Sequence, residues 1–155
     1  MSSVIELTAF TYSSVLSHLV NTEESRNDIV DELFSEPSDL RNEFNRFMDV
    51  YLKKLEELVG KVSVVERPTR EKIKSLNYLP FVIIGSTVEL EEVSSGDTQK
   101  LRVVSPYDAS TSQNDLSYVS EFGRTLILKE TGDIIETNLY GNNTVYRIKS
   151  IRYES

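Results

Sequence analysis

The sequence predicts an α+β protein: an N-terminal antiparallel helical hairpin followed by a small antiparallel β domain with one short helix. Between residues 8 and 59, apolar side chains recur at spacings of three and four, which is typical of amphipathic helices. From Phe81 onward, short β-rich runs alternate with turns rich in Gly, Ser, Asn and Asp. This change of pattern assigns residues 1–60 to the hairpin, 61–80 to a connector and 81–155 to the β domain.

The second helical segment has the clearer pattern. Its apolar residues lie on one face of a helix of about five turns, and Gly60 is a typical stop signal. The opposite face carries charged side chains. We expect these residues to form the buried stripe: Leu40, Phe44, Phe47, Met48, Tyr51, Leu52, Leu55, Leu58 and Val59.

The first helical segment is less regular, because the polar stretch 21–28 interrupts its apolar residues. The pattern therefore predicts either two helices, with Asn21 or Thr22 capping the second, or one kinked helix. Residues 35–39 include Pro37 and form a tight connection, so the two limbs must run antiparallel. The expected buried residues before the polar stretch are Phe10, Val15, Leu16, Leu19 and Val20.

The remaining elements follow from alternation and from turn residues. Residues 62–65 are predicted to be extended, and a helical turn is expected after Pro68 and Thr69. Ser120 is expected to cap a helix that runs to Leu128. The predicted strands are 82–84, 88–90, 99–104, 117–119, 133–139 and 144–153, with turns at 94–97, 130–133 and 141–143.

Composition narrows the function classes. The 155 residues include no cysteine and one histidine, so disulfides, cysteine metal sites and most histidine-based catalysis are excluded. We expect His18 to be a half-buried helix residue. No apolar run reaches the roughly 20 residues of a membrane span, and no secretion signal is visible, so a cytoplasmic location is expected.

The charge distribution indicates which partners are plausible. Residues 1–60 carry −7 of the net charge of −8, so direct binding to duplex DNA is not expected. A basic protein surface or a metal ion would suit this acidity, and keeping the chain in solution is an equally open explanation for it.

Five motifs, in order along the C-terminal part, resemble one known family. They are similar to the C-terminal domain of the bacterial Gre (GreA/GreB) transcription elongation factors, which has an FKBP-like fold. Two positions depart from the family pattern: Glu121 replaces a proline, and Leu128 stands where a glycine usually precedes the lysine. The matching motifs are Ile84-Gly85-Ser86-Thr87-Val88-Glu89-Leu90, Val103-Val104-Ser105-Pro106-Tyr107-Asp108-Ala109, Ser120-Glu121-Phe122-Gly123-Arg124-Thr125-Leu126, Gly132-Asp133-Ile134-Ile135 and Val145-Tyr146-Arg147-Ile148 with Ile151.

The helical half is similar to the coiled-coil hairpin of the same family. Leu7-Thr8 resembles the start of its first helix, and residues 34–39 resemble its tip sequence, F-G-D-L-S-E. Measured against that pattern, each limb is about five residues shorter, or ~7.5 Å of helix. The chain is therefore identified as a diverged relative with a shortened hairpin.

The resemblance implies an accessory factor that is not itself an enzyme. It would bind RNA polymerase at the secondary channel, with its tip near the RNA 3′ end. Glu36 and Asp39 would help to hold a Mg²⁺ shared with the polymerase, supported by Ser38, because Mg²⁺ prefers carboxylate oxygens. The same residues also fit ordinary helix-start chemistry, with Ser35 or Ser38 as the cap and acids in the first turn.

Three hypotheses for function remain open at this point. The first is a Gre-type factor that stimulates cleavage of backtracked RNA, and the second is a non-cleaving, Rnk-like regulator of the same channel. The third is an FKBP-like peptide-binding or prolyl isomerase domain, for which an aromatic-lined cleft is needed. Its candidate rings are Phe81, Tyr107, Tyr118, Phe122 and Tyr140; for the first two hypotheses the candidate polymerase contacts are Phe122, Gly123 and Arg124.

Overall fold

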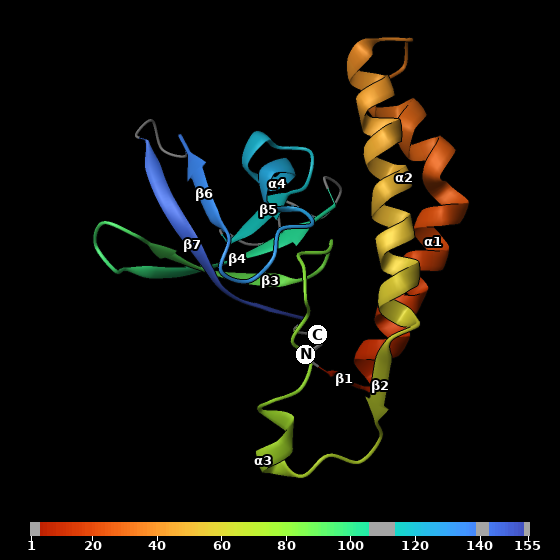
Figure 1. Cartoon of the computed structure of the whole chain (residues 1–155). Helices are drawn as coiled ribbons and strands as arrows, with labels where there is room; N and C mark the ends of the chain where they lie inside the picture. The colour runs from red at the N-terminus through yellow and green to blue at the C-terminus, as the bar shows by residue number, and fades with distance from the viewer. Residues whose placement is uncertain (1–3, 106–113, 139–142, 154–155) are drawn as a thin grey trace. The chain divides into compact units, whose positions relative to one another are not determined.

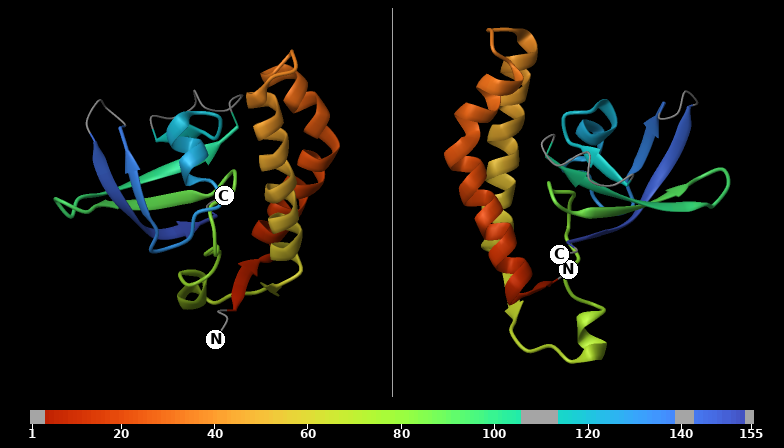
Figure 2. Two further views of the ribbon diagram at one scale, coloured as in Figure 1. Left: turned by 45° about the horizontal axis from the view of Figure 1, so that its top comes forward. Right: turned by 180° about the vertical axis from the view of Figure 1, so that it is seen from behind.

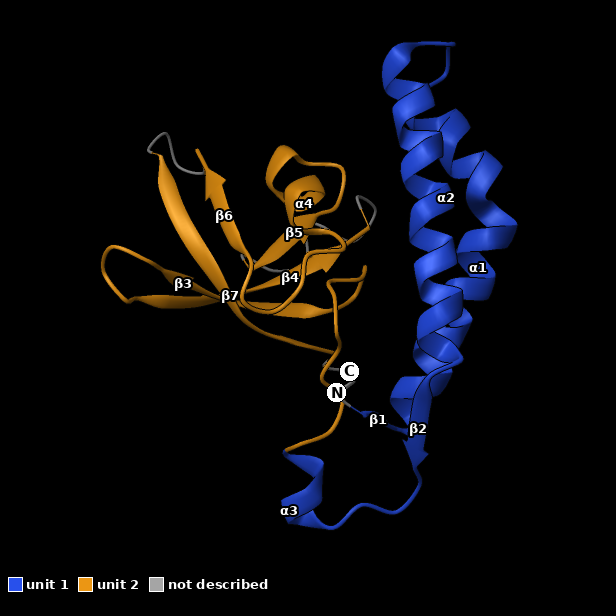
Figure 3. Cartoon of the chain, in the orientation of Figure 1, with its two compact units in different colours: residues 1–74 blue, residues 75–155 orange. Residues whose placement is uncertain are grey.

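The computed structural model describes residues 4–105, 114–138 and 143–153, and the chain divides into two compact units (Figure 3). The first unit comprises residues 1–74 and the second residues 75–155. The first is built around a helical hairpin, and the second around a five-stranded sheet with a short helix. The predicted fold class is therefore confirmed.

The hairpin consists of α1 (Ala9–Leu33) and α2 (Asp39–Val59), which lie side by side in every view (Figures 1 and 2). α1 is one continuous helix of 25 residues, so a cap at Asn21 or Thr22 is wrong. Thr22 is instead buried, because it continues the stripe of Thr11, Val15 and Leu19 at spacings of three and four. The polar stretch thus changes the chemistry of the stripe without ending the helix.

The predicted stripe of α1 is partly wrong. Phe10, Leu16 and Val20 are exposed, whereas Val15 and Leu19 are buried as expected. In α2 the stripe is confirmed, although its first residue, Leu40, is exposed. The buried positions of α1 include two threonines. A prediction from apolar residues alone therefore places the buried stripe on the wrong part of the helix surface.

Two short parallel strands join the ends of the hairpin at its base. β1 (Ile5–Thr8) pairs with β2 (Val62–Val65), with Ile5 opposite Val62. β1 was not predicted, whereas the extended segment 62–65 is confirmed. The predicted helical turn is α3 (Arg70–Ile73), capped by Thr69. Lys72 of α3 forms an ion pair with Glu6 of β1 at 2.8 Å, which ties the connector to the base.

The second unit is a curled mixed sheet with the strand order β5-β4-β3-β7-β6 (Figure 1). β3 lies at its centre and pairs antiparallel with β4 and β7, and β6 pairs antiparallel with β7. β5 pairs parallel with β4. The bounds are β3 Thr87–Glu92, β4 Thr98–Val104, β5 Asp115–Ser117, α4 Glu121–Leu126, β6 Ile134–Thr137 and β7 Thr144–Arg152.

The run 82–84 is not a strand, contrary to the prediction. Val82 and Ile83 are fully buried, but Ile83 bonds through its amide and carbonyl to the hydroxyl of Ser86, which turns the chain. Val82 exchanges main-chain hydrogen bonds with Leu128 and Lys129. An apolar, β-branched run of this length is expected for any buried extended segment, whether or not it joins a sheet.

The region around α4 is close to the prediction. Ser120 caps α4 by accepting a hydrogen bond from Gly123 N, but the helix ends at Leu126, and Leu128 has a φ of +69°. The strand predicted at 117–119 lies at Asp115–Ser117. Motif residues 106–109, Leu139 and most of the turn 141–143 lie outside the described residues.

Candidate functional site

The tip of the hairpin presents its two predicted acids to solvent. Glu36 lies in the connection between the helices, and Asp39 is the first residue of α2; both are exposed. Ser38 is the N-cap of α2, because its hydroxyl accepts a hydrogen bond from Arg41 N at 3.1 Å. The tip therefore fulfils ordinary helix-start chemistry and, in addition, exposes two carboxylates three residues apart in the chain.

Arg41 crosses from α2 to the end of α1. Its guanidinium donates to the carbonyl oxygen of Phe34, the C-cap residue of α1, and forms an ion pair with Asp31 at 2.6 Å. Charged donors to a carbonyl contribute about 1.5–3 kcal/mol, whereas an ion pair with a carboxylate as exposed as that of Asp31 contributes about 0–1 kcal/mol. Most of the stabilisation by Arg41 therefore comes from the carbonyl that it satisfies.

Arg26 makes the reciprocal crossing from α1 to α2. Its guanidinium donates to the carbonyl oxygen of Asn45 at 2.8 Å and forms an ion pair with Asp49. Each limb thus contributes one arginine that bonds a main-chain carbonyl and a carboxylate of the other limb. Neither crossing was predicted from the sequence.

The oxygen chemistry of Glu36 and Asp39 suits a hard cation such as Mg²⁺, which takes one or two carboxylates and keeps several waters. Among the residues that the structure describes, no group of three or more His, Asp or Glu side chains is arranged to hold a metal ion. Two carboxylates fit as partial ligands of an ion that is held chiefly by another molecule.

His18 joins the two limbs at mid-length. Its Nε2 lies 2.7 Å from the hydroxyl of Tyr51 on α2, and its Nδ1 lies 3.4 Å from that of Thr22. Burial lowers the pKa of His18 from 6.5 to about 4, so the ring is neutral at pH 7. The prediction of a half-buried helix residue is confirmed.

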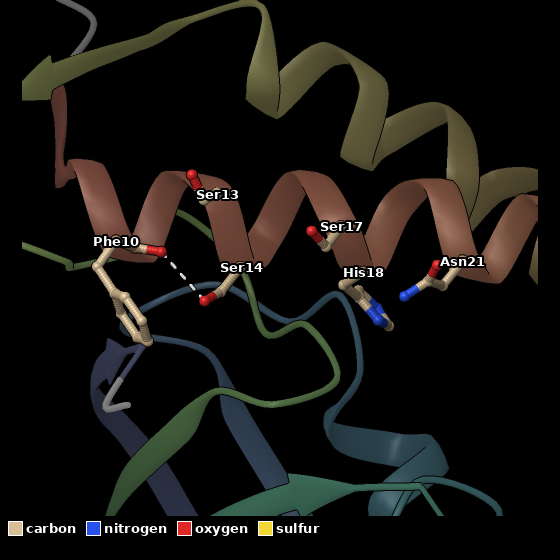
Figure 4. A pocket seen from close by; sticks show the side chains of 6 residues that line it. All are labelled: Phe10, Ser13, Ser14, Ser17, His18 and Asn21. Atoms are coloured by element: carbon tan, nitrogen blue, oxygen red, sulfur yellow. Dashed lines mark hydrogen bonds between the residues drawn. The ribbon is translucent and has the colours of Figure 1, made fainter.

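A shallow hollow follows α1 beside His18 (Figure 4). Ser14 donates a hydrogen bond to the carbonyl oxygen of Phe10 at 3.0 Å within it, and the ring of Phe10 is largely exposed. All the side chains that line it come from one helix, so it forms no enclosed cavity. They are Phe10, Ser13, Ser14, Ser17, His18 and Asn21.

In the second unit, the candidate polymerase contacts have different surroundings. Phe122 and Gly123 of α4 are buried, whereas Arg124 is exposed. A Cβ on Gly123 would lie 2.0 Å from the carbonyl oxygen of Ser117, so any larger residue would displace the backbone there. Of these three candidate contacts, only Arg124 has an exposed side chain that can reach a partner.

A polar cleft of about 220 Å³ lies beside α4 and the ends of β6 and β7. It is lined by two carboxylates, from Glu121 and Glu136, together with amide and hydroxyl groups. Glu121 is the residue that replaces the family's proline. The cleft therefore favours a cationic or hydrogen-bonding group; its remaining lining residues are Thr125, Thr137, Asn138, Asn143, Thr144 and Val145.

The aromatic rings considered for a peptide-binding cleft are largely in the core. Tyr118 and Phe122 are each 4% exposed, so they cannot line an open cleft. Phe81 is half-buried, and Tyr107 and Tyr140 lie outside the described residues. No described helix has both the length and the apolar composition to cross a membrane.

The fold defines an α+β protein with a helical arm and a β domain, and sequence comparisons then define the family. Residues 79–153 match the family model described as "Transcription elongation factor, GreA/GreB, C-term". A GreA of Nautilia profundicola is 40% identical over 73 residues, covering 47% of this chain and 45% of the relative. The C-terminal unit therefore belongs to the GreA/GreB family, which confirms the resemblance of its motifs.

Other relatives show how far the similarity extends. A GreA of Methylococcus capsulatus is 26% identical over 107 residues, covering 69% of this chain and 64% of the relative. The chain thus spans about half to two thirds of the length of these curated relatives. Low identity over the longer match agrees with a diverged relative.

Among solved structures, the Gfh1 protein of Thermus thermophilus is similar, with 21% identity, a TM-score of 0.44 and coverage of 97% of this chain and 99% of that one. A GreA/GreB factor of Nitrosomonas europaea has 22% identity and a TM-score of 0.45, with coverage of 96% and 99%.

Proposed function

We propose that the chain is an accessory transcription elongation factor of Gre type, which binds RNA polymerase at its secondary channel. One observation carries this proposal: a GreA/GreB C-terminal domain shares the chain with a two-limbed helical arm that ends in two exposed acids. The factor has no catalytic residue of its own and acts through the active site of the polymerase.

In this proposal, Glu36 and Asp39 are partial ligands of a Mg²⁺ shared with the polymerase. Such an ion polarises an attacking water and offsets charge on the phosphate of a backtracked RNA. Ser38 fixes the first turn of α2 and with it the backbone of Asp39. The chain's own residues thus position negative charge, while the polymerase provides the remaining ligands and the RNA 3′ end.

A cleavage assay tests this role. Backtracked elongation complexes with labelled RNA would be incubated with wild type, with the double variant Glu36→Ala/Asp39→Ala, and with Glu43→Ala as a control. Glu43 is an exposed acid one turn into α2. Its replacement removes one negative charge, as each tip substitution does, without altering the tip. We expect cleavage with wild type and with Glu43→Ala, and none with the double variant.

The second candidate is a non-cleaving factor that occupies the same channel. The engagement of Arg26 and Arg41 across the limbs favours it, since fewer cations remain near the tip to contact RNA. This candidate predicts uncleaved RNA with every variant, together with slower cleavage when an active Gre factor competes. Failure of wild type to bind core polymerase would contradict both candidates.

The docking surface is proposed to include Arg124 on α4. Arg124→Glu should weaken binding to core polymerase, and Lys129→Glu, an equal charge reversal at another exposed position, should not. Equal effects of the two variants would point to a general charge effect rather than to a contact at α4. An isomerisation assay with a proline peptide tests the remote third hypothesis, for which we expect no activity.

A further inference from the structure

The connection between the limbs is held at both ends by a single residue, Arg41. The main-chain N–H of Arg41 donates to the cap hydroxyl of Ser38, at the end of the connection. Its guanidinium donates to the carbonyl oxygen of Phe34, at the start of the connection. Residues 34–38, which include Glu36, are therefore closed into a loop through one arginine.

We propose that Arg41 is the positioning residue of the tip: it holds the loop 34–38, and thereby Glu36 and Asp39, in the geometry that receives the metal. This inference rests on the proposed metal-binding role of the tip. Mg²⁺ demands near-ideal octahedral geometry at about 2.0–2.1 Å, so a loop that samples many conformations would present its carboxylates correctly only part of the time.

The surroundings of Arg41 agree with a bridging role rather than a solvated charge. Its side chain is 25% exposed, and the ion pair with Asp31 directs the guanidinium toward α1. Pro37 restricts the backbone between the two bonded ends. A planar guanidinium can serve two acceptors at once, which a lysine ammonium on a flexible stem does with much less geometric definition.

The alternative is that Arg41 merely stabilises the hairpin, and Arg26 provides a matched control for it. Arg26 also bonds one carbonyl and one carboxylate across the limbs, and the two arginines have the same side-chain exposure of 25%. Its contacts, however, are to Asn45 and Asp49 in the body of α2. Losing Arg26 should weaken the hairpin comparably while leaving the tip loop ordered.

The test uses ¹⁵N relaxation of the full chain for wild type, Arg41→Ala, Arg41→Lys and Arg26→Ala. In wild type and Arg26→Ala, the amides of Ser35, Glu36 and Ser38 should have order parameters of about 0.85. In both Arg41 variants, the order parameters of these amides should fall to about 0.6 or lower. Tip amides that stay ordered in Arg41→Ala, or that loosen equally in Arg26→Ala, would overturn the proposal.

A kinetic measurement adds a readout that stability alone would not change. Ordering one residue costs about as much free energy as a tenfold change in rate. Arg41→Ala should therefore lower the maximal cleavage rate about tenfold, with the half-saturating concentration of factor unchanged, and Arg26→Ala should change neither. A raised half-saturating concentration at an unchanged maximal rate would overturn the positioning role. If wild type itself does not cleave, the proposed cleavage activity fails, and the order parameters alone decide the role of Arg41.

Discussion

The Nε2 atom of His18 lies 2.7 Å from the hydroxyl of Tyr51, so the single histidine of the chain joins the two limbs of the hairpin. Burial favours the neutral ring over the charged one. The contact between the two limbs therefore depends on the neutral form of the His18 ring.

This contact predicts a loss of stability in mild acid. The pKa of His18 is lowered from 6.5 to about 4, so the unfolded chain binds the proton first and stability falls as the pH drops from 6.5 toward 4. The full loss is on the order of 3 kcal/mol. Thermal unfolding between pH 7.5 and 4 should show a steeper decline for wild type than for His18→Gln. Parallel curves would contradict the prediction.

A second titrating pair should act in the opposite direction. A hydrogen bond to Glu56 of α2 raises the pKa of Glu23 of α1, and desolvation and the charge of Glu56 add to the effect. A raised pKa means stability that is present in acid and lost as the pH rises through it. Glu56→Gln should therefore raise the melting temperature slightly at pH 7, with a smaller gain at pH 4. An equal gain at both values would exclude the carboxyl pair as its cause.

The left-handed backbone of Leu128 predicts an unusual order of substitutions. With φ at +69°, any residue with a Cβ is strained by roughly 1–2 kcal/mol, which glycine avoids. Leu128→Gly and Leu128→Ala remove nearly the same side chain, so they can be compared directly. The glycine variant should be more stable than the alanine variant by about 1 kcal/mol in chemical denaturation. The opposite order would mean that the backbone relaxes on substitution.

Close packing at Gly123 predicts a severe effect of one methyl group. Because its Cβ would meet the carbonyl oxygen of Ser117 at 2.0 Å, Gly123→Ala should lower the free energy of unfolding of the second unit by about 2–4 kcal/mol. Gly96→Ala is the control, since it has a positive φ but no atom within 4 Å of the new Cβ. A loss in Gly123→Ala no larger than that in Gly96→Ala would show that the backbone at Ser117 makes room for the new methyl group, and it would contradict the prediction.

Local patterns predicted most of the elements, because the hairpin and the strands β3, β4, β6 and β7 repeat with helix or strand periodicity. β1 was missed: four residues directly before a helix carry little signal, and their partner strand β2 lies beyond both helices. The prediction of a strand at 82–84 was wrong, because burial of this segment, rather than strand pairing, explains its apolar residues. The position of Leu128 was recognised as unusual from the family's glycine, and its φ supplies the reason.

For the candidate site, the types of residue could be predicted from the sequence, but the contacts of their side chains could not. The roles of Glu36 and Asp39 were inferred from the resemblance of residues 34–39 to the family's tip sequence, and they stay a prediction. Helix rules left the cap open between Ser35 and Ser38, and the structure places it at Ser38. The crossings of Arg26 and Arg41 join residues 7 to 23 positions apart and on different helices, so no local pattern indicates them. Burial of Phe122 and Gly123 likewise depends on packing that only the folded unit reveals.

The parallel pair of β1 and β2 has a mechanical consequence for the arm. The ladder from Ile5 opposite Val62 to Thr8 opposite Val65 fixes where each limb starts. Sliding one helix past the other by one turn, about 5.4 Å, would break every rung of that ladder. The register of the base strands therefore fixes the distance from the base to the tip acids, and the arm has one set length.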